Sequence, residues 1–174
     1  MIEWLQSELR EYYIYIKFIH LLFVMIWAWS TSVAYVFYVR IAWNEWKKDP
    51  TNQVLLDRRD WVYEQFDRGA VLEHIAFPII LITGPLLWVL GNWGLDNNWL
   101  YYKLLIVIFL FIPIEIFDYW IAHFGGNKER LRNKGEEEKR EKMMLIHDKF
   151  LVYISPVIVT SVLSVLFLAI VKPF

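Results

Sequence analysis

Ionisable side chains lie inside the apolar stretches of this sequence, and one group of them has the spacing of a haem site. Lys17 and His20 are three residues apart and therefore share a helix face, and Trp27 follows seven residues after His20. An imidazole binds haem iron, and an indole ring on the same stripe can pack against the macrocycle. Lys103 opens a later apolar stretch at a similar depth. The candidate cofactor-binding residues are His20, Lys17, Trp27 and Lys103.

A simpler interpretation of the same residues needs no cofactor. In it, His20 hydrogen-bonds a neighbouring helix inside a bundle. The two lysines extend their ammonium groups along the helix toward the membrane surface. Spacing alone leaves both interpretations open for His20.

A second group of ionisable residues lies near the other ends of the apolar stretches. Three histidines and four carboxylates occur there at similar depth: Glu73, His74, Glu115, Asp118, His123, His147 and Asp148. Buried polar groups are costly in a membrane and normally point into the helix bundle, where they mark a site. Imidazole and carboxylate together suit iron, manganese or zinc, as in the metal sites of four-helix bundles. The candidate metal ligands are His20, His74, Glu115, Asp118, His123 and His147.

Two further interpretations of this second group stay open. His74 paired with His123 or His147 would hold a second haem from both sides. Alternatively, cations near the interface would neutralise Glu115 and Asp118 in a salt-bridged network. The nearest cations in the sequence are Arg40, Arg68 and Lys149. Because Glu115 lies about 10 Å from the end of its helix, at about 1.5 Å per residue, we expect it to be protonated or paired.

Membrane-spanning helices must position these residues. Of the 174 residues, 57% are hydrophobic, against about 45–50% in an ordinary soluble domain. A span needs about 20 mostly apolar residues, and four segments come close to this length: 18–39, 70–90, 100–122 and 150–171. We predict an all-α fold, a single integral membrane domain (1–174) built as a four-helix bundle. Prolines within the spans predict kinks, at Pro78, Pro85, Pro113 and Pro156.

Lys and Arg are unequally divided between the segments that connect the spans. Six lie in the segment 40–69 and eight in the segment 123–149, which leaves four for the opposite side. Cytoplasmic loops carry the excess of Lys and Arg. We therefore predict that both long segments face the cytoplasm and both termini face outward, in a bacterial-type inner membrane. The charge spacing in both segments also predicts that they are helical.

Composition excludes several classes of protein. The chain has no cysteine, which excludes disulfide scaffolds, thiolate metal sites and cysteine nucleophiles. Its formal net charge of −1 argues against a nucleic-acid partner, which would require a strongly basic surface. No nucleotide-binding loop, serine elbow or zincin motif is present in the sequence.

Several short segments resemble the HemJ type of protoporphyrinogen IX oxidase. The segment KFIHLLFVMIW has the opening of that family, a Lys-x-x-His pair with a Trp seven residues after the His. The segments FYVR, DRR and WLYYKLLIVIFL are further similarities, and the ending LAIVKPF is similar to the C-terminus of the family. A broader group of four-span proteins, including CopD-like copper proteins, shares the pattern of the first span.

The resemblance implies a haem b protein in which the histidine of the first span and the lysine of the third span are the important pair. These are His20 and Lys103 here, with Lys103 as the candidate catalytic residue. The family reaction removes electrons and protons from protoporphyrinogen IX, and the electrons pass through haem to a quinone or another acceptor. The chain departs from the family at Trp29, where a small residue is usual, and at Glu115, where an imidazole would stand.

The expected function is therefore that of a haem b-binding membrane oxidoreductase, a diverged member of this type. The alternatives are a membrane cytochrome b and a carboxylate/histidine metal-binding subunit, each within a larger respiratory complex. The expected partners are the lipid bilayer, a porphyrin or quinone-type small molecule, and further copies of the chain or other subunits. Iron or another metal is a possible additional cofactor.

Overall fold

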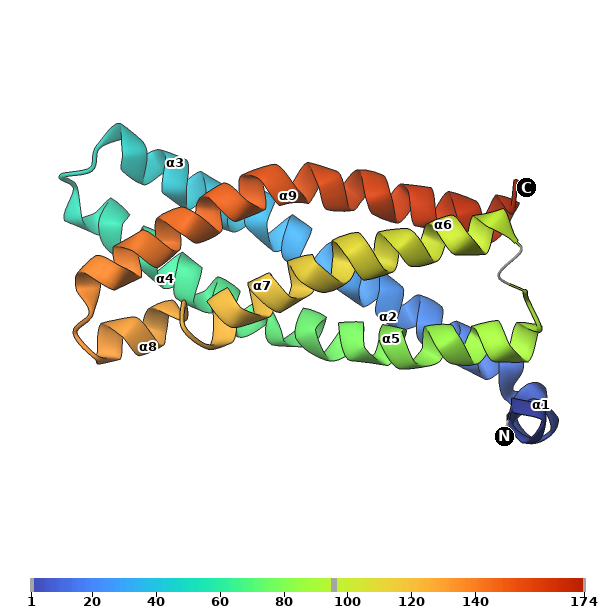
Figure 1. Ribbon diagram of the computed structural model, residues 1–174. Helices are drawn as coiled ribbons and strands as arrows, with labels where there is room; N and C mark the ends of the chain where they lie inside the picture. The colour runs from blue at the N-terminus through green and yellow to red at the C-terminus, as the bar shows by residue number, and fades with distance from the viewer. Residues whose placement is uncertain (1, 95–96, 174) are drawn as a thin grey trace.

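The computed structural model describes residues 2–94 and 97–173, and every regular element within these ranges is a helix (Figure 1). The elements are α1 (Ile2–Leu9), η1 (Arg10–Tyr12), α2 (Tyr13–Ala34), η2 (Tyr35–Val39), α3 (Arg40–Lys48), α4 (Gln53–Gly69), α5 (Val71–Gly91), α6 (Asn98–Ile106), η3 (Val107–Phe111), α7 (Ile112–His123), α8 (Lys128–Asn133) and α9 (Glu137–Val171). The predicted all-α class is confirmed.

Four helices in the described part of the chain are long and apolar enough to span a membrane. They cover Gln6–Lys48, Gln53–Gly91, Asn98–Asn133 and Glu137–Val171 and have 35 to 43 residues, and the third includes the turn between α7 and α8. A bilayer needs about 20 residues, so each helix extends well beyond one hydrocarbon core. Large apolar side chains are exposed along these helices, as expected for helices that contact lipid.

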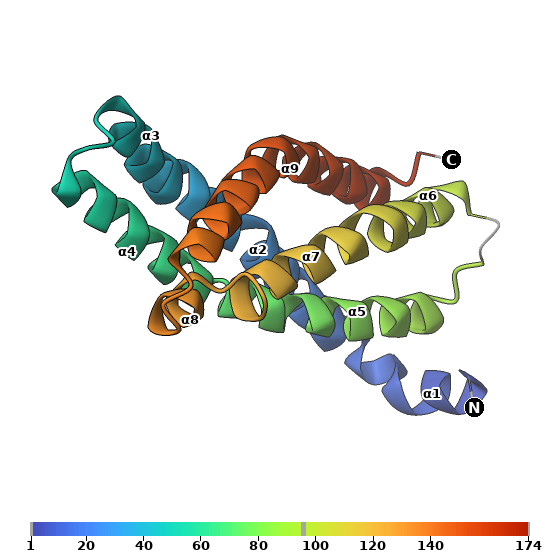
Figure 2. The same cartoon turned by 60° about the vertical axis from the view of Figure 1, so that its left-hand side comes forward.

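The two ends of the bundle differ in what they carry. Helix α1, the end of α5, the start of α6 and the end of α9 lie at one end, which we call the terminal end (Figure 1). Helices α3, α4 and α8 and the start of α9 lie at the other end, which carries most of the Lys and Arg residues and which we call the charged end (Figures 1 and 2). Residues 53–69 and 137–149 are helical there, as their charge spacing predicted.

Asparagines mark the helix boundaries at both ends of the bundle. The side chain of Asn52 accepts hydrogen bonds from the backbone of Val54 and Leu55 at the start of α4. Asn127 accepts one from Arg130 at the start of α8. These side chains satisfy backbone donors that have no partner within the helix. Asn92 ends α5 with φ of 52°, in the left-handed region that asparagine tolerates better than most residues.

Two irregular turns interrupt the spans, and one of them lies beside a proline. The π-helical turn η3 directly precedes α7, which has Pro113 in its first turn. Pro113 lacks the N–H that would continue a regular ladder, and a π turn shifts the register of the residues that follow. Helix α5 continues through Pro78 and Pro85. The shifted register of α7 sets the direction of its carboxylates.

The core at mid-height is an aromatic cluster. Trp27 of α2 lies with its ring centroid 5.4 Å from that of Phe77 and 4.8 Å from that of Phe111. Ala76 of α5 is fully buried beside them. Partly buried leucine, isoleucine and valine side chains surround this cluster. It forms an apolar layer between the two ends of the bundle.

Candidate functional site

His20 lies on α2 toward the terminal end and presents one free ring nitrogen. The residue is 9% exposed, and its Nδ1 lies 2.8 Å from the hydroxyl oxygen of Thr83 on α5. That hydroxyl donates its only proton to the carbonyl oxygen of Ile79 at 2.7 Å. His20 Nδ1 must therefore carry the proton and donate it to Thr83. Nε2 keeps its lone pair, and no described side chain hydrogen-bonds to it.

The structure brings Lys103 near His20 and leaves Lys17 on the outside. Lys103 on α6 is partly buried and lies close enough for its charge to act on the imidazole of His20. The side chain of Lys17 is exposed on α2. Of the two lysines grouped with His20 from the sequence, Lys103 is therefore the one that faces the bundle with it.

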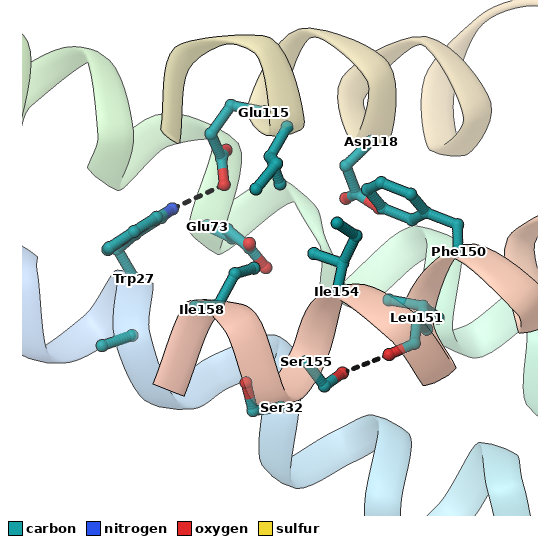
Figure 3. Close-up of a pocket in the computed structure, with 12 residues that line it drawn as sticks. Trp27, Ser32, Glu73, Glu115, Asp118, Phe150, Leu151, Ile154, Ser155 and Ile158 are labelled. Carbon is teal, nitrogen blue, oxygen red and sulfur yellow. Dashed lines mark hydrogen bonds between the residues drawn. The ribbon is translucent and has the colours of Figure 1, made fainter. Parts of the chain in front are cut away.

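Trp27 belongs to a different environment from His20. Seven residues separate them, which is about 10 Å along a helix. The indole N–H of Trp27 donates a hydrogen bond of 2.6 Å to Oε1 of Glu115 on α7. Its ring packs on Phe77 and Phe111. Trp27 therefore links the apolar layer to the carboxylates on its other side (Figure 3).

Three buried carboxyl groups converge around a small cavity next to Trp27. Glu73, Glu115 and Asp118 are 3–5% exposed, and all three line the cavity together with side chains of α9 (Figure 3). Oε1 of Glu115 accepts the hydrogen bond from the indole of Trp27. About 20 Å³ of the cavity is open to the centre of a water molecule, and about 10–15 Å³ suffices for one water. One oxygen of each carboxyl group has no hydrogen-bond partner within the described structure.

Asp118 connects this cavity to two histidines in series. Nε2 of His74 lies 3.2 Å from Oδ2 of Asp118, at an angle outside that of a hydrogen bond. Nδ1 of the same ring lies 2.7 Å from Nε2 of His123, and the two rings meet edge to face. Tyr119 packs against both imidazoles. The side chain of His74 is 5% exposed, whereas His123 is only partly buried, at the end of α7.

A second series of contacts leads from Asp118 to fully buried side chains. His147 of α9 is fully buried, and its Nε2 lies 3.3 Å from Oδ1 of Asp118. Its Nδ1 hydrogen-bonds to the ammonium group of Lys128. Lys128 is also fully buried and donates to Asp67 through both Nζ, at 2.8 Å, and its backbone N–H, at 3.1 Å. These contacts hold Asp118 in place from the charged end.

Two glycines allow Lys128 to reach that position. A Cβ on Gly126 would lie 2.7 Å from the carbonyl oxygen of Ile121, and one on Gly125 would lie 2.6 Å from the ring of Trp120. Only glycine permits so tight a turn of the chain after α7. The turn places α8 against α4, where Asp67 lies.

Among the described residues, no lysine or arginine forms a salt bridge with Glu115 or Asp118, in contrast to the salt-bridge interpretation. Arg68 pairs with Glu129, at 2.6 Å on the surface. Glu115 instead accepts a hydrogen bond from Trp27, and Asp118 lies between two histidines. The salt bridges of the charged end lie farther out and include Arg59 with Asp60 and Glu141, Arg140 with Asp60 and Glu137, and Arg132 with Glu64.

The histidines and carboxylates are arranged as hydrogen-bonding partners. Within residues 2–94 and 97–173, no three of these side chains converge as ligands of one metal ion. His74 and His123 bond directly to each other. His147 bonds to Lys128 and Asp118. Asp148 faces away from this set and accepts from Tyr35 and Tyr63, each at 3.3 Å.

Sequence reasoning did not identify Thr83, Asp67 or Lys128 as parts of these sites. A signal for Asp67 was present, because it lies seven residues before His74 and thus on the same face of one continuous helix. Lys128 gave no such signal, since its burial depends on the glycine turn. Thr83 is one hydroxyl among several in the spans.

An apolar groove lies on the outside of the charged end. It has a volume of about 460 Å³ and is lined by Ser30, Ala34, Tyr38, Val39, Trp61, Val62, Gln65, Phe66, Gly69, Ala70 and Leu72. No charged side chain is among these lining residues, so the groove suits an acyl chain or an apolar ring better than a polyanion.

No protein-family model, curated protein or solved structure matches the chain.

Proposed function

We propose that this protein is a haem b-binding membrane oxidoreductase of the HemJ type, with His20 as the axial ligand of the haem iron. The observation that carries this proposal is the free Nε2 of His20. Ligating histidines commonly donate their other ring N–H to a fixed acceptor, which sets the tautomer and the ring orientation. Thr83 takes that role here, at 2.8 Å from Nδ1.

The residue types around His20 are those that would hold a haem group. His20 supplies a neutral nitrogen ligand, and Lys103 supplies a partly buried positive charge close to it. A tetrapyrrole carries carboxylate groups, which such an ammonium group attracts. When bound, the haem would supply one-electron chemistry between a substrate and an acceptor.

In the proposed reaction, Lys103 orients a porphyrinogen by binding one of its carboxylates. His20 and Thr83 fix the position of the cofactor. The electrons leave to a quinone or another membrane acceptor, a class of molecule that the uncharged groove at the charged end would suit. We further propose that the charged end is cytoplasmic and both termini are external in a bacterial-type inner membrane, since Lys and Arg concentrate at that end.

The test is a reduced-minus-oxidised visible spectrum of the detergent-purified protein, repeated on His20→Ala. We expect a b-type spectrum that His20→Ala loses, while His123→Ala, a histidine outside this site, keeps it. A wild-type protein that folds in the presence of haem and binds none would contradict the proposal. Bound haem without oxidation of protoporphyrinogen would favour an electron-transfer cytochrome b.

A further inference from the structure

We infer that His123, His74 and Asp118 form a proton path from the surface of the charged end to the buried carboxyl pair Glu73–Glu115. The first step has a nearly ideal geometry. Nε2 of His123 and Nδ1 of His74 are 2.7 Å apart, so one ring donates a hydrogen bond to the other. An imidazole that accepts a proton at one nitrogen can release one from the other.

His74 has an acceptor on its far side. Its Nε2 lies 3.2 Å from Oδ2 of Asp118, and neither atom has a hydrogen-bond partner. A small rotation of either side chain brings the two atoms into line for transfer. The ring of His74 thus has one nitrogen toward His123 and the other toward Asp118.

The cavity joins Asp118 to the carboxyl pair. Asp118, Glu115 and Glu73 all line it, and one oxygen of each lacks a partner (Figure 3). A single water fits the cavity and would find there the two or more polar partners that a buried water requires. Glu73 and Glu115 line one small cavity and are both buried. Two carboxylates at such a site disfavour each other's ionisation, so we expect the pair to retain a proton. The carboxyl pair is the inner end of the proton path, where a proton is stored or released.

The path ends at the apolar layer. Beyond Glu115 lie the indole of Trp27 and the rings of Phe77 and Phe111, which offer no further proton acceptor toward His20. The path therefore opens to one side of the membrane only. Chains of carboxylates and imidazoles inside membrane helices are typical of proton relays.

His147 provides a control within the same protein for a proton path through the histidines. His147 also contacts Asp118, but it is fully buried and its other nitrogen faces Lys128. A path through His147 would have no opening at the surface. The inference therefore predicts that the three histidines of this region have unequal effects on proton exchange.

The experiment follows hydrogen–deuterium exchange of the protonated carboxyl group by infrared spectroscopy of the purified full-length protein. Its C=O band should be absent from the double variant Glu73→Gln/Glu115→Gln. After transfer to D2O, we expect His123→Gln and His74→Gln to slow the shift of this band by about tenfold or more, since positioned proton-transfer groups contribute at least that much. His147→Gln, whose amide can still donate to Asp118, should exchange at the wild-type rate.

Two results would overturn the inference. One is a band that survives in the double carboxyl variant. The other is an exchange rate that His123→Gln leaves unchanged, or that His147→Gln slows equally. His123 is only partly buried, so its variant is expected to fold even where His74→Gln does not. The experiment needs no bound haem, so its outcome is independent of the proposed function.

Discussion

Glu115 depends on one hydrogen bond from a neighbouring helix. Its carboxyl group is buried at mid-height in the bundle, where an unpaired polar group costs several kcal/mol (roughly 2–7). The indole N–H of Trp27 lies 2.6 Å from it, and the same ring fills the space between Phe77 and Phe111. Trp27 thus combines an apolar and a polar role, which explains why another aromatic residue would not replace it fully.

Trp27→Phe should retain the ring packing and remove the donor. We expect it to destabilise the protein by about 1–2 kcal/mol, because hydrogen bonds inside membrane proteins contribute up to about that amount. Unfolding in mixed micelles measures this. Trp29→Phe, at an exposed tryptophan on the same helix, is the matched control. A double-mutant cycle with Glu115→Leu that gave no coupling energy would contradict this assignment.

At the scale of single residues, the depth of the ionisable side chains in the membrane was predictable from the sequence, but their interaction partners were not. The sequence predicted that Glu115, Asp118 and His74 lie at one level, because charges are rare in apolar helices. It did not predict that Asp118 lies between two imidazoles. That arrangement depends on the rotation of three helices about their axes, which the π turn η3 alters for α7.

The turn between α7 and α8 determines how the buried residues of the charged end pack together. Gly125 and Gly126 let the chain turn so tightly that Lys128 becomes fully buried against Asp67 and His147. A buried ion pair stabilises only while both partners stay in position, and removal of one leaves an uncompensated charge. The geometry of the turn therefore controls the electrostatics of the site.

Gly126→Ala should displace this turn. Its Cβ would lie 2.7 Å from a backbone oxygen of Ile121, so we expect a loss of about 1–3 kcal/mol in the free energy of unfolding, the usual cost of overpacking. Gly69→Ala is the matched control, since that Cβ meets no atom within 4 Å at the end of α4. It should raise stability by about 0.5–1 kcal/mol. Equal effects of the two substitutions would show that the turn has no such role.

The helices themselves were largely predictable. The four predicted spans all lie within helices of the structure, because apolar stretches of that length have few other solutions in a membrane. The actual helices are longer, since the charged segments continue them. The π turns were not predictable, because a one-residue insertion in a helix leaves no mark on composition.

The whole molecule has two polar sites separated by an apolar layer. His20, Thr83 and Lys103 lie on the terminal side of Trp27, and the carboxylate–histidine network lies on the charged side. The two sites would therefore face opposite compartments if the bundle spans a membrane.

The orientation of the molecule can be tested with single cysteines, because the chain has none of its own. Lys134→Cys at the charged end and Asn98→Cys at the terminal end are both at exposed positions. In spheroplasts, a membrane-impermeant maleimide should label position 98 directly and position 134 only after permeabilisation. The reverse pattern would place the charged end outside.

The most direct test of the proposed haem site is His20→Gly in the presence and absence of imidazole. Removal of the side chain leaves a space into which free imidazole can bind as a replacement ligand. We predict that the b-type spectrum of the purified protein is lost in His20→Gly and returns when imidazole is added. A spectrum that is unchanged by the substitution, or a folded variant that imidazole fails to restore, would contradict the assignment of His20 as the haem ligand.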